Sequence, residues 1–86
     1  MNALLLAIIL ATTPNAVGGR ISLTSEKCND SSYIAFSFAE NGDTISGCWF
    51  SEQELVFIKW ENGTVKTYPA EKFTLTKEAQ AAQGGR

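Results

Sequence analysis

Cysteine is the residue type whose spacing first suggests a chemical interpretation. The chain contains two cysteines, Cys28 and Cys48, and no histidine. A Cys-x-x-Cys redox pair is absent, and two distant thiolates cannot supply the four ligands of a structural zinc site. We therefore expect a structural disulfide, which contributes roughly 3 kcal/mol when it closes a loop of about 20 residues. We expect neither a metal ion nor a cofactor.

Groups that could catalyse acid–base or nucleophilic chemistry are poorly represented. The commonest general base is missing because the chain has no histidine. Glu52, Glu54 and Glu61 fall in predicted turns, where carboxylates are usually solvated. The serines have no activating partner nearby in the sequence. The sequence therefore predicts a protein that is not an enzyme.

Charge is unevenly distributed along the 86 residues, because all seven basic and nine acidic side chains lie from Arg20 onward. The apolar run Ala3–Ala11 is much shorter than the roughly 20 residues of a transmembrane helix. Small residues follow it, as in a secretory signal. We expect residues 1–18 to be a cleaved export signal, cut after Ala16 or Gly18. A first strand or buried helix of a cytosolic domain and a retained membrane tether are the alternatives.

The expected location follows from the signal and the cysteines. An exported chain reaches an oxidising compartment, the periplasm or the cell exterior, where a disulfide persists. A domain this small buries only about 60% of its unfolded surface and commonly needs such a bridge. The net charge of −2 argues against a nucleic-acid partner, and no stable membrane span is expected.

The remaining sequence is typical of short strands joined by tight turns. Alternating apolar residues and turn residues predict a small β domain over residues 19–75, with residues 76–86 as a flexible tail. The predicted strands and a final strand fragment are residues 20–24, 32–39, 42–50, 55–60, 65–69 and 70–75. The fold class is all-β, a small antiparallel meander of about five strands, stapled by one disulfide. A half-open barrel of the SH3-like kind is expected, and a flat sheet with one solvated face is the alternative.

Two Asn-Gly dipeptides fix the expected strand register. Asn41-Gly42 favours a two-residue type I′ hairpin turn. Phe36 then faces Gly47, which leaves room for the ring, and Ile34 faces Trp49. In this register Phe36 and Trp49 contribute to the core, and Cys48 points to the opposite face.

The second dipeptide, Asn62-Gly63, predicts a similar hairpin. A two-residue turn there would place Lys59 opposite Lys66, and like charges in that position are unfavourable. A bulge or a wider loop is therefore the alternative for this hairpin.

Aromatic side chains provide the candidate binding surface. The expected register places four of them on the second face of the sheet or at its edges: Tyr33, Phe50, Phe57 and Tyr68. An exposed aromatic strip would bind a partner, whereas packing under a loop or the tail is the structural alternative.

The motifs "GGRISLT…C" (18–28), "GCW" (47–49) and "VFIKWENGTVKTYP" (56–69), together with Phe73, resemble an uncharacterised group of small exported proteins of proteobacteria and their tailed phages. The likeness covers nearly the whole chain, with Asn62-Gly63 where Asp-Gly is frequent. It implies a bacterial or phage origin and a disulfide domain, but no activity.

The sequence thus predicts a small exported, non-catalytic binding module of the periplasm or cell envelope. Its expected partner is a protein of the envelope, and a phage-encoded version would modulate a host component. The alternative is a structural subunit of a virion or envelope assembly that retains its N-terminal segment. The oligomeric state is left open.

Overall fold

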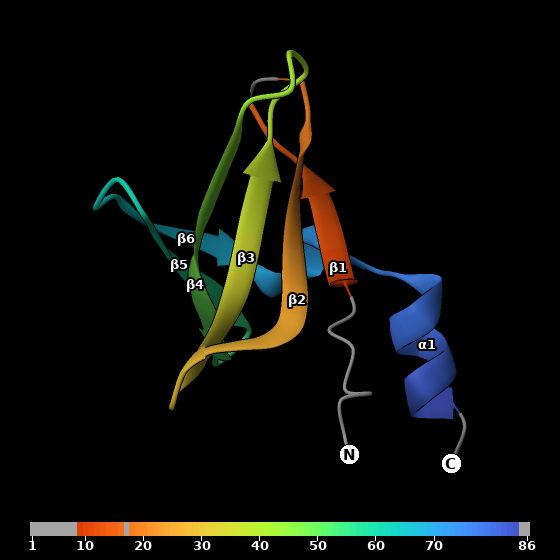
Figure 1. Cartoon of the computed structure of the whole chain (residues 1–86). Helices are drawn as coiled ribbons and strands as arrows, with labels where there is room; N and C mark the ends of the chain where they lie inside the picture. Colours follow the sequence, from red (N-terminus) through yellow and green to blue (C-terminus); the bar gives the residue numbers. More distant parts are fainter. Residues whose placement is uncertain (1–8, 17, 85–86) are drawn as a thin grey trace, which may run out of the picture.

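The computed structural model describes residues 9–16 and 18–84. It contains one antiparallel sheet with strand order β6-β5-β4-β3-β2-β1-β7, curled into a half-open barrel (Figure 1). The elements are β1 (Ile9–Pro14), β2 (Arg20–Asn29), β3 (Ser32–Phe38), β4 (Thr44–Glu52), β5 (Leu55–Trp60), β6 (Val65–Pro69), the 3₁₀ turn η1 (Ala70–Lys72), β7 (Thr74–Leu75) and α1 (Lys77–Gly84). The predicted all-β class, meander and half-open barrel are confirmed.

Strands β1 and β7 extend the predicted meander at one side. β1 pairs with β2 and β7, although its residues belong to the segment that the sequence assigns to an export signal. The first eight residues of that segment lie outside the described residues. The segment predicted as a flexible tail contains α1, which follows Thr76; the Thr76 hydroxyl accepts a hydrogen bond from the amide of Ala79 at 3.2 Å. Within the described part of the chain, no helix is long and apolar enough to cross a bilayer.

The register predicted from Asn41-Gly42 is wrong by one residue. Phe36 faces Ser46 and Ile34 faces Cys48. The cause is a three-residue loop, Glu40 to Gly42, closed by a hydrogen bond from the amide of Ala39 to the carbonyl of Asp43 at 2.8 Å. Gly42 takes φ 98° at the end of this loop, as in a type I turn followed by a bulge.

The second Asn-Gly hairpin uses the same wider loop, which was the alternative that the sequence left open. The amide of Trp60 donates to the carbonyl of Thr64 at 2.8 Å, and Gly63 has φ 92°. Lys59 therefore faces Val65, and Lys66 faces Ile58. The like-charge pair expected from a two-residue turn is avoided.

A two-residue turn does occur, between β4 and β5, where the sequence indicates only a polar connection. Glu52 pairs with Leu55, and the two residues between them, Gln53 and Glu54, have φ of 53° and 68°. Positive φ at both central positions is the geometry of a type I′ turn, which Asn and Gly adopt more readily. This turn therefore holds two side chains in an unfavourable backbone region.

The one-residue shift exchanges the two faces of β3 relative to β4. Paired residues share a face, so the inner face of the curl carries Ala35, Trp49 and Ile58, and the outer face carries Phe36 and Phe50. The buried core lies on the inner face and consists of Ala11, Ile21, Leu23, Ala35, Val56, Ile58 and Trp60. The interpretation of Phe36 as a core residue is therefore wrong, and that of Trp49, which packs against the core, is confirmed.

Gly47 is required by a close approach of β4 to β5, not by the Phe36 ring. A Cβ at this position would lie 2.5 Å from the Lys59 carbonyl oxygen and 3.0 Å from Cε3 of Trp60. The indole of Trp60 thus occupies the inner face directly beside Gly47.

Candidate functional site

The Cys28–Cys48 disulfide predicted from the sequence is present. The Cα atoms of the two cysteines are 5.7 Å apart, within the usual range for a bridge. The bond joins the end of β2 to β4 on the outer face, beside Ile34, which pairs with Cys48. It fixes the part of β2 where two register shifts interrupt the pairing with β3.

Two aromatic pairs lie on the outer face. The rings of Phe50 and Phe57 stack across β4 and β5 with centroids 4.9 Å apart and planes within 11°. Phe36 and Phe38 stack along β3 with centroids 6.1 Å apart. We call these four phenylalanines, together with the exposed Leu55 of β5, the outer aromatic surface.

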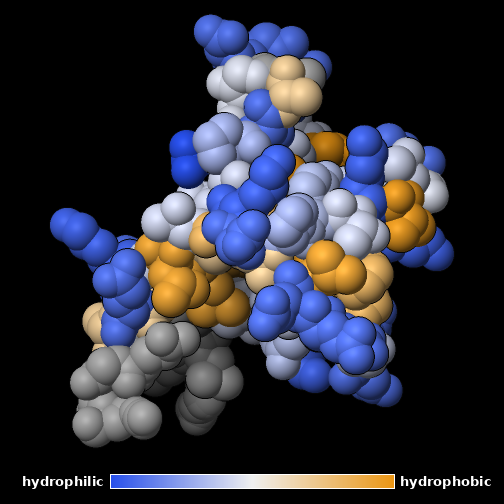
Figure 2. Space-filling model, turned by 180° about the vertical axis from the view of Figure 1, so that it is seen from behind, coloured by the Kyte–Doolittle hydropathy of each residue, from blue (hydrophilic) through white to orange (hydrophobic). Residues whose placement is uncertain are grey.

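The exposed fractions of the side chains show whether the disulfide covers the outer aromatic surface. Phe38 and Phe50 are each 42% exposed and Leu55 is 37% exposed. The bridge therefore leaves both aromatic pairs open to solvent. On the side of the molecule opposite to the view of Figure 1, apolar side chains form separate groups between hydrophilic ones (Figure 2).

The four sequence-predicted aromatics do not share one face. Phe50 and Phe57 lie together on the outer face. Tyr33 pairs with Trp49 on the inner side, where its ring lies 5.6 Å from the indole and 5.2 Å from the Lys27 ammonium. Tyr68 pairs with Val56, also on the inner side, and meets Phe73 edge to face.

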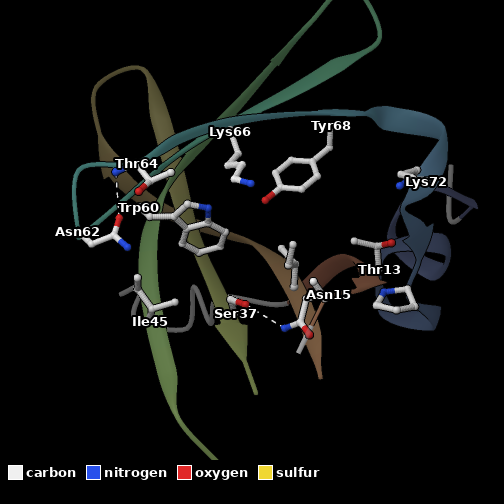
Figure 3. Close-up of a pocket in the computed structure, with 13 residues that line it drawn as sticks. Thr13, Asn15, Ser37, Ile45, Trp60, Asn62, Thr64, Lys66, Tyr68 and Lys72 are labelled. Atoms are coloured by element: carbon white, nitrogen blue, oxygen red, sulfur yellow. Dashed lines mark hydrogen bonds between the residues drawn. The ribbon is translucent and has the colours of Figure 1, made fainter. Parts of the chain in front are cut away.

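The inner face contains a second candidate site, a cavity of about 730 Å³ (Figure 3). Its walls come from the β1–β2 turn, β4, β5, β6 and η1. Its lining includes Trp60, Asn62, Thr64, Lys66, Tyr68 and Lys72. Sequence reasoning missed this site because a two-residue turn would put Trp60 and Lys66 on opposite faces of the sheet. They share a face only when the loop between β5 and β6 has three residues. The unfavourable Lys59–Lys66 pair was the signal that could have revealed it.

One wall of the cavity is held in place by Asn15. Its side-chain amide donates to the carbonyl of Phe38 at 2.8 Å and to the hydroxyl of Ser37 at 3.0 Å. Its side-chain oxygen accepts a hydrogen bond from the amide of Gly19 at 2.8 Å. The β1–β2 turn is thereby fastened to the end of β3.

Among residues 9–16 and 18–84, no three histidine, cysteine or carboxylate side chains lie close enough together to hold a metal ion. Comparison of the chain with family models, curated proteins and solved structures found no match.

Proposed function

We propose that this protein is a small, non-catalytic binding module that acts after export, in the periplasm or at the cell envelope. The observation that carries the proposal is the stacked Phe50–Phe57 pair on the outer face, with Phe50 42% exposed. Burying an aromatic side chain at an interface is strongly favourable, and aromatic residues are enriched among those that dominate binding. A protein of the envelope is the proposed partner.

The outer aromatic surface has features of a docking face. The Phe50–Phe57 pair is cross-strand and stacked, so its rings are already ordered before binding and lose little freedom on docking. The neighbouring disulfide limits movement of the strand that carries Phe50. The disulfide is also compatible with an oxidising compartment. The likeness to exported proteins of proteobacteria and their tailed phages extends the proposal to modulation of a host envelope component by a phage-encoded chain.

Site-specific photo-crosslinking in cells tests this proposal. A benzoyl-phenylalanine placed at Phe50 should capture one envelope protein. The same probe at Glu78, an exposed position of α1, which packs against β1 on the other side of the sheet, should not capture it. Phe57→Ser should abolish the capture at position 50. Equal capture at both positions, capture of a second copy of this chain alone, or no capture would refute it.

A structural subunit that retains its N-terminal segment is the second candidate, and strand β1 favours it. β1 lies between β2 and β7, and its Ala11 and Thr13 are only 6% and 7% exposed. Intact mass of the protein recovered from cells separates the two candidates. Loss of about 16 to 18 residues together with a two-hydrogen deficit supports export and processing, whereas a full-length chain supports retention.

A further inference from the structure

The inner cavity has the dimensions of a small-molecule site. Its volume of about 730 Å³ lies within the range of roughly 300–1,000 Å³ that is typical of ligand pockets. Trp60 lies in the cavity wall, and Lys66 and Tyr68 of the adjoining strand β6 extend over the same space (Figure 3). The cavity lies on the inner face of the sheet, so ligand binding there does not depend on docking at the outer aromatic surface. It requires that residues 13–16, which line the cavity, remain part of the protein.

An unsatisfied donor points into this space. Trp60 is only 7% exposed, and its indole N–H has no hydrogen-bond acceptor among residues 9–16 and 18–84. In Figure 3 its nitrogen is directed toward Lys66 and Tyr68. By contrast, the indole N–H of Trp49 donates to the carbonyl of Thr24 at 3.0 Å. A buried donor without a partner is costly, so an acceptor delivered by a ligand would be stabilised there.

Charge in the cavity has one sign. Lys66 and Lys72 line it, no aspartate or glutamate does, and neither lysine forms an ion pair within the described part of the chain. The chain as a whole carries a net charge of −2. An acid-free, lysine-lined concavity in an acidic protein selects for an anion.

The rest of the lining selects the body of the ligand. The half-buried Tyr68 presents an aromatic ring, against which the apolar face of a sugar ring can pack. Hydroxyl and amide groups of Thr13, Asn62 and Thr64 also line the cavity. Asn62 and Thr64 are exposed, so their side chains can bond to water. Sugar hydroxyls can replace that water, whereas a purely hydrocarbon acid cannot.

We propose that the inner cavity binds an anionic monosaccharide, with its ring against Tyr68 and its charged group between Lys66 and the Trp60 indole N–H. The anion can be a carboxylate, as in a uronic acid, or a phosphate, as in a sugar phosphate. Both accept several hydrogen bonds from N–H donors.

Proton–nitrogen NMR titration of the full chain tests the proposal, because Trp60 and Trp49 give separate indole N–H signals. Glucuronate, glucose 6-phosphate and neutral glucose are added in turn. We expect the Trp60 signal to shift with at least one anionic sugar and the Trp49 signal to stay in place. Whichever anion shifts it at lower concentration identifies the charged group. No shift with either anion, or an equal response to glucose, overturns the proposal.

Two lysine variants provide the matched comparison. Lys66→Gln removes a cavity charge and should weaken anion binding about tenfold, a loss of about 1.4 kcal/mol. Lys59→Gln removes the same charge from the outer face of the same hairpin and should leave binding unchanged. Equal weakening by both variants would show general charge attraction and overturn the assigned site.

Discussion

Replacement of Gly47 by alanine tests the close approach of β4 to β5. The new Cβ would lie 2.5 Å from the carbonyl oxygen of Lys59 and 3.0 Å from both Cα and Cε3 of Trp60. Two of these three atoms belong to the backbone of the adjacent strand, so a side-chain rotation cannot relieve the contact. β4 and β5 must separate locally, with loss of packing around Trp60.

Two opposing effects set the size of the change in the free energy of unfolding. Alanine in a strand interior gains about 0.5–1 kcal/mol over glycine because it loses less backbone freedom on folding. Overpacking of a tight site costs about 1–3 kcal/mol. The net loss from these two ranges is about 0–2.5 kcal/mol. Because the new Cβ would lie 2.5 Å from a backbone oxygen, the cost falls in the upper part of its range, and we expect Gly47→Ala to lower the free energy of unfolding by about 1–2 kcal/mol. The melting temperature should fall by roughly 4–8 °C for each kcal/mol.

Urea unfolding monitored by tryptophan fluorescence measures this change directly. Ser46→Ala is the control, because Ser46 lies next to Gly47 but on the outer face, where it donates an exposed hydrogen bond to Glu61. Its effect should stay within about 0.5 kcal/mol. A Gly47→Ala variant as stable as the wild type, or more stable, would refute the strand separation described here.

Three further substitutions test other parts of the fold. Gln53→Asn with Glu54→Gly should raise the free energy of unfolding by about 1 kcal/mol, because both positions have positive φ; a lower thermal midpoint would contradict the turn geometry. Cys28→Ser with Cys48→Ser should lower the free energy of unfolding by roughly 3 kcal/mol in urea titrations, and a reductant should have no further effect on this double variant. Ile58→Ala should cost about 2–5 kcal/mol because Ile58 is fully buried, while Ile58→Val should cost about 0.5–1.5 kcal/mol; similar losses for both would argue against tight packing.

The strands and the disulfide could be predicted because their signals are local. Alternating apolar residues identify β3 and β5 whatever the register, and two cysteines leave one intramolecular pairing. Register was harder to predict. The Asn-Gly dipeptide fits a two-residue turn, and also a three-residue loop with glycine last, because both use a glycine with positive φ. A difference of one residue exchanged the faces of β3 and moved Phe36 outward.

The candidate sites depended on that register. Phe50 and Phe57 were grouped correctly because they pair across β4 and β5. Tyr33 and Tyr68 were placed with them, although each lies on the inner side. The inner cavity combines residues from distant strands and the 3₁₀ turn, and no local pattern reports such a combination.

The position of β1 makes the order of two cellular events important. Ala16, one of the expected cleavage points, is exposed in the turn between β1 and β2. A peptidase that cuts there after folding would leave β1 as a separate peptide, still held in the sheet by its pairing with β2 and β7. A cut before folding would instead leave β2 with an unpaired edge and uncover Ile21 and Leu23. The same bond, broken at two different times, would therefore produce two different molecules.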